Sequence, residues 1–203
     1  MVDPYFELAG CDDGSTNDEP PPDNEIIVPS TGVQVYNGNG TSYTGSNTVK
    51  GKIYNVTPEV FLDVGTITDG KLTLALPEIV QDAWLDIYEG SSAIIEPSDL
   101  RVYYKGFGRV FNGSNETGYL SFTNDADTQE HNAYYIYFNK DATITGTHVS
   151  SSNPGNSTEY TITGKKGWNL VYEHDVDSGK SVVTTNSSSM PNNMKWFFTP
   201  KRE

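Results

Sequence analysis

The reactive and metal-binding side chains of this sequence are few, and their spacing matches no familiar catalytic motif. Cys11 is the only cysteine, and the three histidines, His131, His148 and His174, show neither His-x-His nor H-E-x-x-H spacing. No G-x-S-x-G stretch places a nucleophilic serine on a turn. A zinc site or a familiar nucleophile is therefore not indicated. Two of the 27 acidic residues converging in the fold would still provide the carboxylate pair of a glycoside hydrolase.

One acidic segment has the composition of a calcium loop. Asp125, Asp127 and Glu130 offer the hard oxygen ligands that Ca²⁺ takes in proteins. The segment lacks the glycine and the spacing of an EF-type loop. A solvated acidic loop between strands is therefore the favoured interpretation, with Ca²⁺ as the only cofactor that the sequence brings into question.

A second acidic segment places two carboxylates around a histidine, in the order Glu173, His174, Asp175. The surrounding sequence predicts a strand, and adjacent strand residues point to opposite faces of a sheet. Glu173 and Asp175 are therefore expected to share one face, with His174 on the other. A zinc site at this place would need ligands from other strands.

Aromatic residues are better candidates for ligand contact, because tyrosine and tryptophan combine an apolar ring with a polar group. Trp84, Tyr103, Tyr104 and Trp168 are the candidate ligand-binding residues. Trp84 lies in the segment 78–88, where apolar residues recur every three or four positions behind a proline and predict a short helix. That helix would cover the mouth of a barrel. Burial in the core is the simpler interpretation for Trp168.

The elements that would position these residues are short strands joined by turn residues. The alternating stretch 71–76 (KLTLAL) puts three leucines on one face and follows the turn signal TDG. About ten such strands, largely connected as hairpins, predict an all-β fold, an antiparallel barrel or a sandwich, with one short helix near 78–88. Residues 26–203 are expected to form this single domain, which is long enough to bury a core without disulfides.

The N-terminal 25 residues have a different composition. The stretch Leu8 to Cys11 resembles a bacterial lipobox, the small-residue motif whose cysteine receives lipid. Residues 12–24 are polar and include three consecutive prolines, which predicts a solvated, semi-stiff tether. Residues 1–25 are therefore expected to be disordered and lipoprotein-like, with Cys11 as the lipidation site and the tether holding the domain clear of a membrane.

The seven residues before this motif contain neither the basic region nor the apolar core of a signal peptide. Either a native leader has been replaced, or Cys11 is an ordinary exposed thiol. The first interpretation is favoured, because a lone cysteine in a polar run otherwise has little function. The chain as given is expected to be soluble, and its native form to meet a membrane only through a lipid anchor.

Composition disfavours several classes of partner. The chain has 13 basic and 27 acidic residues, a net charge of −14, and such a surface repels phosphate backbones, so no nucleic-acid partner is expected. No run of about 18 apolar residues is available to span a bilayer. With one cysteine, no disulfide can form within the chain.

Four stretches carry a more specific resemblance: GTITDGKLTLALP, AYYIYFNKDATITGT, GKKGWNLVYEH and MKWFF, in this order between Gly65 and Phe198. They are similar to segments of small uncharacterised lipoproteins of spirochaetes such as Treponema, in which a lipobox and a tether precede a β domain. The resemblance implies a bacterial cell-envelope lipoprotein of the outer membrane or the cell surface. It implies no activity and no functional residue.

The sequence thus favours a non-enzymatic cell-envelope lipoprotein whose β domain binds an extracellular or periplasmic ligand. One alternative is a lipocalin-like barrel that carries a small apolar molecule, which requires a hollow lined by apolar side chains. The other alternative is a hydrolase, which requires two carboxylates, or a histidine and a carboxylate, in one cleft.

Overall fold

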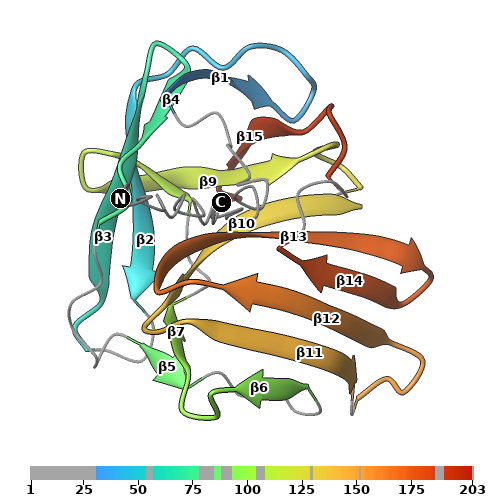
Figure 1. Cartoon of the computed structure of the whole chain (residues 1–203). Helices are drawn as coiled ribbons and strands as arrows, with labels where there is room; N and C mark the ends of the chain where they lie inside the picture. The colour runs from blue at the N-terminus through green and yellow to red at the C-terminus, as the bar shows by residue number, and fades with distance from the viewer. Residues whose placement is uncertain are drawn as a thin grey trace, which may run out of the picture.

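Fifteen β-strands and no helix occur in the part of the chain that the computed structural model describes. The strands form one continuous hydrogen-bonded system with two parts, a closed barrel and a curled sheet (Figure 1). The described residues are 31–53, 57–77, 85–87, 93–103, 108–128, 130–150, 152–185 and 190–202.

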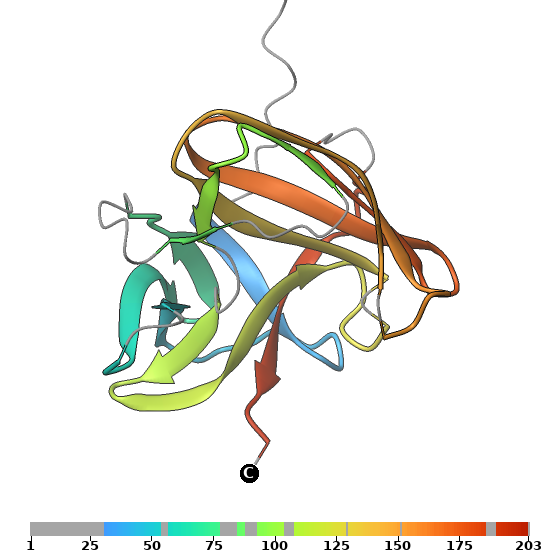
Figure 2. The ribbon, with the colours of Figure 1, turned by 90° about the horizontal axis from the view of Figure 1, so that it is seen from below.

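Seven strands close the barrel. Neighbouring strands are antiparallel except β15 and β1, which run parallel, and β15 also pairs with β9 and so completes the ring. Trp196 has both Val35 and Phe122 as partners, and Figure 2 shows the blue strand β1 beside the red strand β15. Around the barrel the order is β1 (Thr31–Asn37), β4 (Lys71–Leu74), β3 (Val60–Thr68), β2 (Asn47–Ile53), β8 (Arg109–Asn112), β9 (Asn115–Thr123) and β15 (Lys195–Pro200).

The interior of the barrel is filled by side chains of its own strands. Val35, Val64, Leu72 and Val110 have no exposed surface, and Trp196 is 2% exposed. All five belong to one core cluster. A barrel of about eight strands is only just wide enough for its own side chains, and the packed interior seen here gives no support to the lipocalin-like alternative.

The curled sheet continues from β9 through β10. Its core cluster combines Leu100, next to β7, with Ile144 of β11, and Ile95 of β6 packs against it. Because these residues come from both ends of the strand order, the sheet bends round to bring them together. Figure 1 shows its middle strands one below another. The order is β5 (Asp86–Ile87), β7 (Arg101–Tyr103), β10 (His131–Phe138), β13 (Gly167–Asp177), β14 (Lys180–Thr184), β12 (Ser157–Gly164), β11 (Ala142–Val149) and β6 (Ile94–Glu96).

A third buried cluster joins the two parts. Ile53 at the end of β2 packs with Tyr103 of β7 and Tyr137 of β10, and Trp168 lies against them. The Trp168 ring meets Tyr103 and Tyr137 edge-on, with ring centroids 5.7 and 5.5 Å apart. Its Nε1 donates a hydrogen bond to the carbonyl oxygen of Pro77 at 2.7 Å. These aromatic rings therefore hold the barrel and the curled sheet together.

The prediction of an all-β fold with a barrel is confirmed, and its details need correction. The count of about ten strands was too low, in part because β5 and β6 have only two or three residues each and leave no alternating pattern to detect. Two neighbouring pairs, β1–β15 and β12–β14, are parallel and so are not hairpins.

The helix predicted near 78–88 is wrong for the described part of that segment. Asp86–Ile87 forms strand β5 and pairs with Val102 and Arg101 of β7. Pairing with a neighbouring strand overrides the helical spacing of apolar residues there. The stretch 78–84 and residue 88 lie outside the described residues.

Candidate functional site

A hollow lined by polar side chains lies at one end of the curled sheet, where the β11–β12 loop meets the β13–β14 turn. Its volume is about 290 Å³, close to the lower end of small-molecule sites at about 300 Å³. We call this surface the polar hollow. A row of four strand residues forms one side, and the rest of the lining consists of Ser150, Asn156, Ser157, Gly179 and Lys180.

The strand register explains why the row of four forms. His148 of β11 pairs with Thr158 of β12, and Thr158 pairs with Ser181 of β14. Ser181 in turn pairs with Asp175 of β13. Because directly paired residues point to the same face of a sheet, an imidazole, two hydroxyls and a carboxylate stand side by side. The two hydroxyls are hydrogen-bonded at 3.0 Å, and either of them can be the donor.

The next row inward combines aromatic and acidic side chains. Tyr160 of β12, Val183 of β14 and Glu173 of β13 are paired there, and Tyr134 and Tyr160 pack against the apolar core of the curled sheet. Burial of the half-buried Glu173 carboxyl raises its pKa, the charge of Asp175 raises it further, and a hydrogen bond with Tyr134 opposes them. The prediction that Glu173 and Asp175 share a face is confirmed.

Backbone hydrogen bonds fix the rim of the polar hollow. The Ser150 amide donates to the Asn156 carbonyl at 2.9 Å, and the Ser157 amide donates to the Gly179 carbonyl at 2.8 Å. The first bond closes the β11–β12 loop, and the second joins the end of that loop to the β13–β14 turn. Gly179 has a φ of +75°, and a Cβ on it would overlap the Asn156 side chain. Glycine is therefore required where turn and loop meet, and the rim is preformed.

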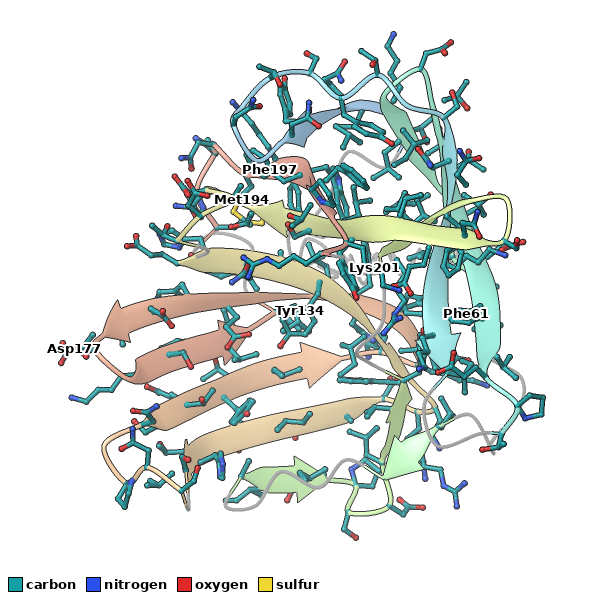
Figure 3. All side chains as sticks on the ribbon, turned by 180° about the vertical axis from the view of Figure 1, so that it is seen from behind. Phe61, Tyr134, Asp177, Met194, Phe197 and Lys201 are labelled. Atoms are coloured by element: carbon teal, nitrogen blue, oxygen red, sulfur yellow. The ribbon has the colours of Figure 1, made fainter. Side chains whose placement is uncertain are left out.

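The charged groups of the polar hollow are unequally satisfied. The Asp175 amide donates to the Glu130 carbonyl at 3.0 Å, but no hydrogen bond or ion pair joins the Asp175 carboxylate to another described residue. Lys180 Nζ lies 3.5 Å from the carboxylate of Asp177, which Figure 3 shows at the tip of the β13–β14 hairpin. The lysine therefore has an exposed carboxylate partner outside the hollow, whereas the Asp175 carboxylate is available to a ligand.

Replacing Glu173 by glutamine is expected to stabilise the protein at pH 7, by about 0.5 kcal/mol or more. The raised pKa means that the folded state holds the proton more tightly than the unfolded state. This contribution to stability is complete below the unfolded pKa of about 4.3 and is lost as the pH rises through the folded pKa. The Glu173→Gln variant has no carboxyl group to ionise at this position, so its stability does not fall in this way as the pH rises.

Thermal unfolding at pH 4 and pH 7 checks this prediction. The difference in melting temperature between Glu173→Gln and the parent should be small at pH 4 and favour the variant at pH 7. His174, whose pKa is lowered by burial and by His131, destabilises both proteins as the pH falls through about 6.5, so it cancels in the comparison. A variant that is less stable at pH 7 would contradict the assignment.

A second cluster lies on the opposite face of β13. The side chains of His131, Tyr172 and His174 stack with ring centroids 5.1 to 6.0 Å apart, and His131 Nδ1 lies 2.6 Å from the Tyr172 hydroxyl. His131 and His174 are direct partners on β10 and β13. Within the described ranges, no three His, Cys, Asp or Glu side chains form a group that could hold a metal ion. We therefore interpret this stack of three rings as side-chain packing between β10 and β13.

The candidate ligand-binding aromatics are not brought together at the polar hollow. Trp168 and buried Tyr103 lie in the cluster between the barrel and the curled sheet, so burial explains them. Trp84, Tyr104 and the candidate lipidation site Cys11 lie outside the described residues.

The candidate calcium group does not form among the described residues. Asp125 Oδ1 accepts hydrogen bonds from the amides of Asp127 and Thr128, at 2.7 and 3.1 Å, and these two bonds lower the pKa of its carboxyl. The carboxylate of Asp125 therefore closes a turn. Asp127 and Glu130 are exposed, as expected of a solvated acidic loop.

Sequence reasoning missed most of the polar hollow. Among the residues that line the hollow, Asp175 alone is assigned by the sequence pattern to a particular face of a strand. Thr158 and Ser181 are common strand residues, and no local spacing marks them as a site. The available signal was indirect: the turn stretches SSNPGNS and DSG contain small polar residues, and both prove to lie at the same end of the sheet.

Two further findings complete the description of the chain. In the described part of the chain, no helix is both long enough and apolar enough to cross a membrane. Searches against protein-family models, curated protein sequences and solved structures find no match to this chain.

Proposed function

We propose that this protein is a non-enzymatic, lipid-anchored binding protein of a bacterial cell envelope, displayed on the outer membrane or the cell surface. In this proposal the β domain captures a small polar ligand in the polar hollow. The row His148, Thr158, Ser181 and Asp175 is the observation that carries it. Four different strands supply four hydrogen-bonding side chains to one preformed hollow, and convergent polar groups of this kind orient small ligands.

The anchor is proposed from Cys11 and the polar tether that follows it, in keeping with the resemblance to spirochaete lipoproteins. We expect the chain, expressed in a diderm bacterium behind a functional lipoprotein leader, to gain the mass of acyl chains at Cys11 and to enter the membrane fraction. Cys11→Ser is the matched control and should remain soluble. Unmodified Cys11 in the soluble fraction, while a known lipoprotein in the same cells is acylated, would refute the anchor.

A hydrolase is the second candidate, because Glu173 and Asp175 share a face of β13. The Cα atoms of same-face neighbours on one strand lie about 6.5 Å apart, a backbone spacing from which two carboxyl groups could reach one ligand. Glu173, with its raised pKa, would be the general acid. Turnover of 4-nitrophenyl glycosides that is lost in Glu173→Gln would favour this candidate, whereas saccharide binding without turnover would favour the first.

Trp84 and Tyr104 remain predicted ligand contacts. Each is tested by alanine replacement once a ligand is known. Replacing a residue that contacts the ligand should lower the affinity and leave the melting temperature unchanged. Trp168 is the contrasting case, because its position between the two parts predicts loss of stability instead.

A further inference from the structure

We infer that the polar hollow binds an uncharged saccharide of one or two sugar rings, an inference that rests on the proposed binding function. The first support is the lining itself. Four hydroxyls, one amide, one imidazole, one carboxylate and the Lys180 ammonium group line the hollow, and each sugar hydroxyl both donates and accepts hydrogen bonds. A lining dominated by hydroxyl and amide groups, with one strong acceptor and one strong donor, matches this chemistry.

The hydroxyl pair shows this versatility directly. Thr158 Oγ1 and Ser181 Oγ are 3.0 Å apart, and either can donate to the other. Whichever hydroxyl donates within the pair, the other keeps its own hydrogen for a ligand oxygen. The Asp175 carboxylate beside them is an acceptor, and a charged acceptor forms stronger hydrogen bonds than a neutral one.

The row next to the lining, on the same face of the sheet, contains aromatic side chains that pack against the core. Tyr160 lies two residues from Thr158 on the same face of β12, and Tyr134 packs against the same apolar core. Gly146, which pairs with Tyr160 across the β11–β12 ladder, contributes no side chain. Neither tyrosine is among the side chains that line the hollow, so recognition rests on the hydrogen-bonding groups of the lining.

Other classes of small ligand fit less well. An apolar molecule would find no apolar side chain in the lining. An anion would meet the Asp175 carboxylate within a chain of net charge −14, and the Lys180 ammonium group already pairs with Asp177. A small organic cation would pair with Asp175 alone and leave the hydroxyls and the amide unused. It is the alternative that the experiment distinguishes.

The experiment is an amide-resolved NMR titration of the whole chain. The probes are cellobiose, maltose and N-acetylglucosamine, with spermidine as a cationic probe, each at up to about 10 mM, which is above the Kd of 1 mM that corresponds to weak binding. We expect saturable shifts of His148, Thr158, Ser181 and Asp175 amides with at least one saccharide. The amides of the barrel should not move.

Matched variants test the contacts. Asp175→Asn should weaken saccharide binding about tenfold, and Thr158→Val several-fold. Asp63→Asn is the charge control, because Asp63 lies on β3 and pairs with Lys50. Thr147→Val is the hydroxyl control, because Thr147 is exposed and precedes His148 on β11, so it points to the other face. Neither control should change the affinity.

The outcomes separate the inference from the function on which it rests. Saccharide-dependent shifts at the hollow that are weakened in Asp175→Asn support both. Shifts at the hollow with spermidine alone overturn the saccharide while keeping the hollow as a binding site. If none of the probes shifts these amides, both the saccharide and the hollow as the site for a small polar ligand are rejected.

Discussion

Replacing Gly70 by alanine is expected to destabilise the protein by about 2–4 kcal/mol. Gly70 has a φ of +76° in the turn between β3 and β4, a conformation that costs an L-residue about 1–2 kcal/mol. A Cβ there would also overlap the carbonyl oxygen of Tyr43. The turn cannot move aside freely, because the Gly70 amide donates to the Gly45 carbonyl at 3.0 Å and its carbonyl accepts from the Val35 amide at 2.8 Å.

Gly40→Ala is the matched control for this substitution. Gly40 has a φ of +79°, and nothing lies within 4 Å of a Cβ built on it. It therefore carries the backbone strain without the overlap. Urea unfolding of the two variants should show the larger loss for Gly70→Ala, and equal losses would show that the packing of Gly70 against Tyr43 is unimportant.

Replacing Trp196 by alanine is expected to cost about 3–5 kcal/mol, as large-to-small changes of buried aromatic residues do. Trp196 is 2% exposed, and its ring lies 5.0 Å from that of Phe122, centroid to centroid. It stands on the strand that closes the barrel, between Val35 of β1 and Phe122 of β9. The cavity left by the substitution would therefore lie where β15 joins β1 to β9, which is the place where the barrel closes.

Two further variants separate ring volume from the indole nitrogen. Trp196 Nε1 is buried and has no hydrogen-bond partner among the described residues. Trp196→Phe therefore loses volume but also removes an unsatisfied donor, and should cost less than half as much as the alanine change. Tyr119→Ala, on neighbouring β9 but 42% exposed, should change the unfolding free energy little. If Tyr119→Ala lowers the unfolding free energy as much as Trp196→Ala does, the burial of Trp196 on the closing strand β15 is not what makes Trp196→Ala costly.

These two predictions concern the barrel, whereas the proposed ligand site lies at the far end of the curled sheet. The division has a physical basis. The described core of the barrel is packed with apolar side chains, so it mainly supplies stability. The curled sheet is apolar in its core and polar at one end, so its end residues can serve a ligand at little cost to the fold.

The site could be predicted from the sequence only in part. The alternation of a strand was enough to place Glu173 and Asp175 on one face, and the register confirms it. Trp168 was a candidate for ligand contact or for the core, and only its contacts with Tyr103 and Tyr137 decide in favour of the core. The acidic loop could not be judged until the amides of Asp127 and Thr128 were seen to bind Asp125.

The sequence by itself determined the positions of most strands, the turn at Asp69 and Gly70, and the buried faces, because these follow from the two-residue period of a strand and from local turn chemistry. Only the tertiary structure decided that β15 closes a barrel between β1 and β9 and that β12 lies parallel to β14. Such pairings join segments far apart in the chain, and no local pattern specifies which strand edges meet. The polar hollow depends on them, because Thr158 meets Ser181 through the parallel pair.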